Sequence, residues 1–219
     1  MLNLNIAVKN QAIHDTKRKV TARTIYPTFK RIFDITLVLV TSPIWFLLFT
    51  IVCAVVYFTS PGPAIFKQKR VGKNGKIFTL YKFRSMYITA PSTTPTYLLK
   101  NPETHITPVG RFIRKYSLDE LPQIFNILKG DMSVVGPRPA QPNEKKLLKE
   151  RDKYNANSIH PGLTGLAQVI LRDNCNVKSK TELDGDYVKA MSFFVDVKLI
   201  FATVWVVASA HNFYEGKRE

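Results

Sequence analysis

The sequence has little cysteine, no clustered histidine and few acidic residues. Its two cysteines, Cys53 and Cys175, lie far apart and form neither a disulfide framework nor a C-x-x-C metal pair. The four histidines, at positions 14, 105, 160 and 211, form no group that would ligate a metal. The pattern gives no support for a disulfide-stabilised secreted fold, and a reducing cytoplasm is the simplest location.

Acidic residues are half as numerous as basic ones. The 219 residues contain 16 Asp and Glu against 32 Lys and Arg, which gives a formal net charge of +16. This charge predicts an anionic partner, and nucleic acid, an acidic membrane surface and a phosphorylated substrate all fit. A hydrophobic fraction of 45% is enough for a folded core in one or two domains.

One long segment lacks charge altogether. No charged residue occurs from Ile35 to Phe58, and this run exceeds the roughly 20 residues that a membrane-spanning helix needs. The segment is too long and too far from the N-terminus to be the apolar part of a signal peptide. It predicts a membrane helix, and a helix buried in a soluble core is the alternative.

Basic residues flank this segment on both sides. Lys30 and Arg31 precede it. The residues that follow it include Lys67, Lys69, Arg70, Lys73 and Lys76. Basic flanks prefer the cytoplasm, so both ends are expected there, and the helix must enter the membrane and return on the same side.

A helix breaker lies at a suitable place for such a return. Pro43 removes a backbone donor and clashes with the preceding turn, which kinks a helix. The hydroxyls of Thr41 and Ser42 can bond the carbonyls that the kink frees. We therefore predict a re-entrant membrane helix kinked at Ser42-Pro43. A single span with a harmless kink stays open.

The rest of the chain predicts an α+β fold, mainly helical with a small β element. Residues 64–86 indicate two short strands joined by a Gly72–Gly75 turn, and residues 87–110 an irregular loop. Further segments predict short helices at 109–117 and 121–130, a rigid loop at 134–142, a basic surface helix at 143–154, a turn leading into a strand at 160–170, and a final amphipathic helix at 187–210. The last helix would lie on the membrane surface or pack on the soluble core.

Two adjacent acids, Asp119 and Glu120, stand in a basic neighbourhood. The nearby basic residues are Arg111, Arg114, Lys115 and Lys129. The structural explanation is a capping box, in which Ser117 caps a helix and Glu120 reaches back to it. The functional explanation is a Mg²⁺ site beside substrate phosphates, with a carboxylate as nucleophile, because no histidine or cysteine stands beside a suitable base.

Four motifs in order make the sequence resemble the bacterial sugar transferases. They are "KFRSM" (82–86), "SLDELPQ" (117–123), "NILKGDMSVVGPRP" (126–139) and "HPGLTGLAQV" (160–169). The small, monotopic phosphoglycosyl transferases of this family start the assembly of lipid-linked glycans. The resemblance runs from about residue 30 to about residue 205, and it also implies a re-entrant membrane helix.

The resemblance implies transfer of a sugar-1-phosphate from a UDP-sugar to undecaprenyl phosphate, with release of UMP. It makes Asp119 the nucleophile, through a covalent aspartyl-phosphosugar intermediate, and Glu120 its partner at Mg²⁺. Arg114 corresponds to a phosphate-binding arginine of the family. Residues 170–187, "ILRDNCNVKSKTELDGDY", are where we expect the choice of sugar.

Further basic residues fit a phosphate or nucleotide contact. Lys82 and Arg84 alternate along a predicted strand, where a solvated strand face is the alternative. Arg138 stands between Pro137 and Pro139, whose fixed φ angles make the loop rigid, and a plain turn is the alternative.

These expectations define three regions: a basic N-terminal arm (1–29), the re-entrant membrane helix (30–59) and a cytoplasmic catalytic domain (60–219). The predicted location is the bacterial inner membrane, with the active site on the cytoplasmic face. The expected partners are the UDP-sugar, undecaprenyl phosphate and membrane lipids. A homo-oligomer stays open.

Two other functions compete with this transferase. The first is a non-enzymatic, membrane-anchored basic protein that binds acidic lipid or nucleic acid. The acid pair argues against nucleic acid, and no standard nucleic-acid motif occurs. The second is a transferase with a soluble acceptor, against which the long apolar segment argues.

Overall fold

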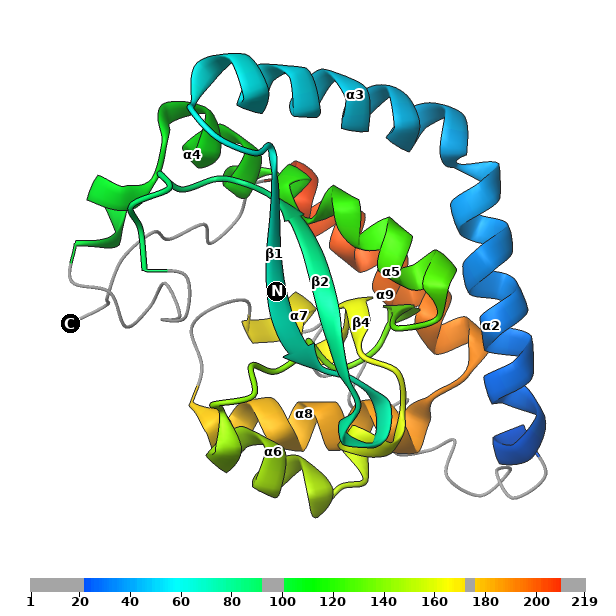
Figure 1. Ribbon diagram of the computed structural model, residues 1–219. Helices are drawn as coiled ribbons and strands as arrows, with labels where there is room; N and C mark the ends of the chain where they lie inside the picture. Colours follow the sequence, from blue (N-terminus) through cyan, green and yellow to red (C-terminus); the bar gives the residue numbers. More distant parts are fainter. Residues whose placement is uncertain (1–21, 92–100, 172–175, 210–219) are drawn as a thin grey trace.

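The computed structural model describes residues 22–91, 101–171 and 176–209. Within these ranges the fold is α+β and mainly helical, as predicted, with two sheets of two strands each. Helices α2 (Ala22–Val40) and α3 (Ser42–Thr59) run along two sides of the molecule, and the remaining elements lie inside the corner that they form (Figure 1).

The uncharged segment is divided between two helices. Helix α2 ends at Val40, Thr41 has helix-breaking ψ near 0°, and α3 starts at Ser42 with Pro43 in its first turn. The hydroxyl of Thr41 donates to the carbonyl of Leu37 at 2.7 Å, which satisfies one of the acceptors that the break leaves. The chain changes direction at the break, so α2 and α3 point different ways (Figure 1).

The N-terminal boundary differs from the prediction. Helix α2 begins at Ala22, inside the stretch assigned to the arm (1–29), while residues 1–21 lie outside the described part of the chain. Local sequence gave few helix signals here. The helix is extended by a tertiary contact, because Tyr26 and Lys30 both donate to Asp196 of the last described helix.

Helix α3 is long and apolar enough to cross a membrane. Its 18 residues have a mean hydropathy of 2.0, and only 11% of them are buried in the molecule. Val52 and Val56 pack inward, against a small core that includes Phe83 and Ile113. The outward side chains, such as Ile44 and Phe46, are exposed. An exposed apolar face of this length is consistent with a membrane location.

The predicted hairpin is confirmed. Strands β1 (Ile65–Val71) and β2 (Ile77–Phe83) pair antiparallel from Ile65 opposite Phe83 to Val71 opposite Ile77. The connection contains the short 3-10 helix η2 (Lys73–Gly75), where Asn74 and Gly75 both have positive φ. Such residues are the ones that tolerate the left-handed region.

Short helices follow the hairpin. The end of the predicted loop at 87–110 contains the 3-10 helix η4 (Pro102–His105) and the start of α4 (Pro108–Lys115). The helix predicted over 121–130 is two elements. Its first residues belong to the 3-10 helix η5 (Leu118–Gln123), which Pro122 favours, and α5 (Ile124–Lys129) follows and ends at Gly130 with φ +89°.

The second sheet brings distant loops together. Strand β3 (Ser133–Val135) runs parallel to β4 (Gly162–Thr164). A side chain at Gly162 would lie 2.0 Å from the backbone nitrogen of Gly136, and one at Gly165 would lie 2.1 Å from the Gly136 carbonyl. Glycine is therefore required where these two loops cross.

Two predicted elements in this part of the chain are only partly confirmed, because the strand predicted within 160–170 is limited to β4 and the helix predicted at 187–210 starts later. The segment "LAQVI" forms helix α7 (Leu166–Leu171) rather than a strand. The helix predicted at 187–210 corresponds to α9 (Phe193–Ala208), and the residues before the extended Ser192 form a separate helix, α8 (Val177–Ala190). The predicted basic surface helix is confirmed as α6 (Lys145–Asp152), and η6 (Ala156–Ser158) follows it.

The break before α9 turns an acid inward. Asp196 is fully buried and accepts hydrogen bonds from Tyr187 at 2.8 Å, from Tyr26 at 2.6 Å and from Lys30. Large apolar side chains of α9, including Phe201 and Trp205, are exposed, together with Lys198. Helix α9 therefore buries its acidic residue and exposes large apolar side chains, whereas a helix on a soluble core normally does the opposite.

The buried Asp196 predicts a large stability effect. Asp196→Asn leaves the Lys30 ammonium without its nearest anion, and breaking one partner of a buried ion pair costs about 3–5 kcal/mol. Asp186→Asn is the matched control, because Asp186 makes only an exposed 3.7 Å contact with Lys189, of the kind worth about 0–1 kcal/mol. Thermal unfolding of the detergent-solubilised variants measures both. Equal melting temperatures would show that the Asp196 network does not hold α2 and α9 together.

Candidate functional site

The acid pair lies against the hairpin. The 3-10 helix η5 carries Asp119 and Glu120, and it packs on β2. The ammonium of Lys82 on β2 is 2.7 Å from Oε1 of Glu120 and 3.8 Å from Oδ2 of Asp119. The side chains of all three residues are at most 16% exposed. One lysine therefore sits between two buried carboxylates.

The capping-box explanation of this pair is wrong. Ser117 has φ +52°, in the left-handed region, and its side chain makes no capping hydrogen bond. An N-cap residue normally has extended backbone, so its hydroxyl can reach the helix N–H groups. Here the chain turns sharply out of α4, and the Ser117 N–H donates to the Arg114 carbonyl instead. The Glu120 carboxylate therefore does not take part in a cap and pairs with nearby cations instead.

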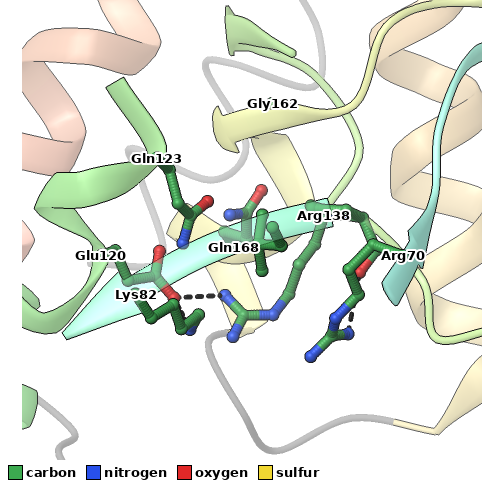
Figure 2. Close-up of a pocket in the computed structure, with 9 residues that line it drawn as sticks. Arg70, Lys82, Glu120, Gln123, Arg138, Gly162 and Gln168 are labelled. Atoms are coloured by element: carbon green, nitrogen blue, oxygen red, sulfur yellow. Dashed lines mark hydrogen bonds and ion pairs between the residues drawn. The ribbon is translucent and has the colours of Figure 1, made fainter. Parts of the chain in front are cut away.

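The loop after β3 brings a second cation to Glu120. Nη1 of Arg138 lies 3.1 Å from Oε1 of Glu120, and the two side chains point toward one another (Figure 2). The carbonyl of Arg138 accepts from Arg151, which is itself paired with the buried Asp184 at 2.7 Å. The Pro137 carbonyl accepts from the Gly162 N–H at 2.9 Å. The loop is thus fixed by bonds as well as by its prolines.

A third cation, Arg70 on β1, was not singled out as a site residue by the sequence. Its Nη1 donates to the Pro139 carbonyl at 3.0 Å, and its other guanidinium nitrogens bind Gln68. Burial and the nearby positive charge of Arg138 lower the pKa of Arg70 to about 10, so it remains charged at neutral pH. Two arginines this close favour an anion between them.

These side chains line one pocket. Figure 2 shows Lys82, Glu120, Arg138 and Arg70 around it, and the full lining is Arg70, Leu80, Lys82, Glu120, Gln123, Arg138, Pro139, Gly162 and Gln168. Gln123 and Gln168 were also not assigned from the sequence, although both stand in the motifs that carry the resemblance. Each is a single polar residue in an apolar stretch, and this pattern could have identified both as candidate site residues.

The two acids have different electrostatics. Burial raises the pKa of Asp119, and the adjacent Glu120 carboxylate adds to this increase. Burial also acts on Glu120, but the positive charges of Lys82 and Arg138 outweigh it and lower the pKa of Glu120 to about 2. Glu120 is therefore ionised at neutral pH, and Asp119 is the more basic carboxylate of the two.

The other predicted site residues lie outside this pocket lining. Arg84 is buried and donates to the Ser60 carbonyl at 2.6 Å. Arg114, on α4, is near enough for its charge to lower the pKa of Asp119. Ser42 and Pro43 lie at the junction of α2 and α3. Part of the segment expected to choose the sugar, residues 172–175, lies outside the described residues.

The donor set suits a Mg²⁺ ion only together with substrate. In the described part of the chain, no group of three His, Cys, Asp or Glu side chains surrounds a common point. Mg²⁺ is commonly held by one or two carboxylates and completes its shell with substrate phosphates and water. Asp119 and Glu120 fit that pattern, so the ion would bind with the donor diphosphate rather than alone.

The chain is similar to several proteins named as sugar transferases or sugar phosphotransferases. The chain is 45% identical over 179 residues to the uncharacterized sugar transferase EpsL of Bacillus subtilis, covering 80% of this chain and 85% of EpsL. It is 36% identical over 217 residues to the undecaprenyl-phosphate galactose phosphotransferase of Salmonella typhimurium, covering 92% of this chain and 44% of that protein.

The name of a third relative includes a nucleotide sugar. The UDP-N-acetylgalactosamine-undecaprenyl-phosphate N-acetylgalactosaminephosphotransferase of Aeromonas hydrophila is 36% identical over 188 residues, which cover 82% of this chain and 44% of that protein. The chain thus spans less than half the length of two of these relatives and most of the third. The family model for bacterial sugar transferases matches residues 25–210, and the chain belongs to the bacterial sugar transferase family.

Proposed function

We propose that the chain transfers a sugar-1-phosphate from a UDP-sugar to undecaprenyl phosphate and releases UMP. The observation that carries the proposal is the Asp119-Glu120 pair, held by Lys82, in which Glu120 lines a pocket together with Arg138 and Arg70. The Aeromonas hydrophila relative is named for both of these substrate classes, and the Salmonella typhimurium relative is named for undecaprenyl phosphate and galactose; both names support the same reaction. In a non-enzymatic protein that binds anions, carboxylates among the basic residues would not improve binding.

The cations of the pocket suit a diphosphate. Phosphoryl transfer requires positioning and neutralisation of charge more than covalent chemistry by the protein. Lys82, Arg138 and Arg70 would bind the phosphates of the donor and offset the negative charge on the departing UMP. Bound Mg²⁺ would add Lewis-acid polarisation of a phosphoryl oxygen, held by Asp119 and Glu120.

The transfer would occur in two steps. A carboxylate oxygen of Asp119 attacks the phosphorus that carries the sugar. The bond from that phosphorus to the bridging oxygen breaks, and UMP leaves with the electron pair. An oxygen of undecaprenyl phosphate then attacks the same phosphorus, the bond to Asp119 breaks, and the carboxylate is regenerated. The product is undecaprenyl-diphosphate-sugar, the first lipid-linked intermediate of a glycan.

Helix α3 would keep the candidate site close to the polyprenyl phosphate acceptor. A polyprenyl phosphate places its phosphate at the membrane surface, and α3 is the element apolar enough to enter the membrane. We propose that α2 and α3 form the re-entrant unit, with both ends on the cytoplasmic face of the bacterial inner membrane, because both flanks are basic.

The topology predicts cytoplasmic access on both sides of α3. Single cysteines at Thr28 and Lys76, both exposed, are placed in a background with Cys53→Ser and Cys175→Ser. A membrane-impermeant maleimide should label neither in intact cells and both in inverted membrane vesicles. Labelling of one position in intact cells would indicate a full span and contradict the re-entrant arrangement.

The nucleophile predicts a covalent protein species. Without acceptor lipid, the wild-type enzyme should release about one equivalent of UMP and gain one sugar phosphate at Asp119, as a two-step route requires. Asp119→Asn should abolish both events, because an amide is a very poor nucleophile. Intact-protein mass spectrometry with a panel of UDP-sugars measures the adduct and identifies the sugar. UMP release that depends strictly on lipid, from an unmodified protein, would contradict the covalent route.

The second carboxylate predicts metal dependence linked to the donor. Chelation should abolish UMP release, and Glu120→Gln should lower the rate by about 100-fold or more, as removal of an electrostatic group in a site commonly does. Mg²⁺ should bind more tightly in the presence of a non-reactive UDP-sugar analogue than alone. Glu150→Gln is the control, because Glu150 pairs with Lys153 on the surface of α6 and does not line the pocket. Full activity in excess chelator would exclude the metal.

A further inference from the structure

Arg84 is buried with most of its hydrogen-bonding capacity unused. It is 7% exposed, and its Nε and Nη1 have no hydrogen-bond partner among the described residues. Nη2 alone donates, to the carbonyl of Ser60 at 2.6 Å. Within the same described ranges no carboxylate forms an ion pair with it. Burial of a charged group is costly unless hydrogen bonds or an opposite charge compensate for its loss of water.

The surroundings of Arg84 are built around it. Ser60, directly after α3, is 6% exposed, and its hydroxyl also has no partner in the described structure. Gly62 has φ +106°, and a side chain there would lie 2.6 Å from Nη1 of Arg84. The positive φ requires glycine at this position, and the absence of a side chain leaves the guanidinium uncrowded. Two unpaired buried polar groups at one place indicate a ligand with acceptor atoms.

The position of Arg84 indicates where such a ligand comes from. The site lies at the end of α3, where the exposed apolar side chains of Tyr57 and Phe58 precede Ser60. Ile88, which would be 3.3 Å from a side chain at Gly62, is 69% exposed. A cation bordered by exposed apolar groups suits an anionic group attached to a hydrocarbon.

Arg84 also stands close to the acid pair along the chain. Its N–H donates to the Ala64 carbonyl at 2.8 Å and so continues the pairing of β1 with β2. Side chains two positions apart in a strand lie on the same face, about 6–7 Å from each other. Lys82, which binds Glu120, is two positions before Arg84. Arg84 is thus displaced from Lys82 toward the end of the apolar helix α3.

We propose that Arg84 and Ser60 form a site for the phosphate group of a membrane lipid. The phosphate oxygens would accept from Nε and Nη1 of Arg84, the paired geometry in which a guanidinium binds a phosphate, and from the Ser60 hydroxyl. The lipid is either the polyprenyl phosphate acceptor or a phospholipid of the bilayer. Its assignment as the acceptor rests on the proposed function.

The test measures lipid binding without any sugar nucleotide. The full-length protein is purified in a phosphate-free detergent and titrated with undecaprenyl phosphate, with phosphatidylglycerol and with inorganic phosphate, and the melting temperature gives each Kd. Arg84→Gln keeps a donor for the Ser60 carbonyl but removes the charge. It should weaken binding of the preferred lipid at least about tenfold, since hydrogen bonds to charged groups are strong.

Two further variants complete the comparison. Lys76→Gln removes one positive charge from the exposed turn of the hairpin, far from α3 (Figure 1), and should leave each Kd unchanged. Arg84→Lys retains the charge without the fork and should weaken binding less than Arg84→Gln. It also serves as the test if Arg84→Gln does not fold. The source of the phosphate follows from which lipid loses affinity.

Several outcomes would overturn the site. A lower melting temperature for Arg84→Gln with unchanged lipid Kd values would mean that Arg84 only caps α3. Equal stabilisation of the wild type by inorganic phosphate would assign the pocket to a free anion. Because no donor is present, these outcomes are independent of the transfer reaction. A protein that binds lipid through Arg84 but transfers no sugar phosphate would contradict the proposed function alone.

Discussion

The structure depends on a buried carboxylate that joins its first and last described helices. Asp196 of α9 accepts hydrogen bonds from Tyr26 and Lys30 of α2 and from Tyr187 of α8. A fully buried carboxylate is stable only with such partners. Because α2 continues into α3 at Thr41, this contact also sets where the apolar helix leaves the rest of the molecule.

The same region of α2 is connected to the pocket. Asp34 accepts from the Ser133 hydroxyl at 2.6 Å and from the Val134 N–H at 3.2 Å, and both belong to β3. The loop that follows β3 carries Arg138 to Glu120. Buried hydrogen bonds thus tie α2 to β3, and the loop after β3 carries the arginine of the site. The physical consequence of this arrangement is a fixed distance between the apolar helix and the acid pair, which a lipid substrate would require.

The charge balance of the chain has a local meaning at the pocket. Glu120 is matched by both Lys82 and Arg138, while Arg70 stands beside them without a carboxylate at the pocket. Cations therefore exceed the acids that line it, and the excess favours a polyanion over a neutral ligand. Arg84 extends this pattern toward α3. The net charge of +16 predicted an anionic partner, and the basic residues at the pocket and Arg84 contribute to that charge.

The sequence by itself determined the elements whose signal is local. The apolar run from Ile35 to Phe58, its break near Pro43, the β hairpin and the acid pair are visible in the order of residues, because each depends on neighbours in the chain. Tertiary structure alone decided the role of Glu120, which pairs with Lys82 and Arg138 rather than capping its helix, and the inclusion of Arg70 in the pocket. It also decided the early start of α2 and the inward turn of Asp196. These features depend on contacts between residues far apart in sequence. A buried charge requires an oppositely charged or hydrogen-bonding partner, and the local sequence does not show which distant residue will supply it.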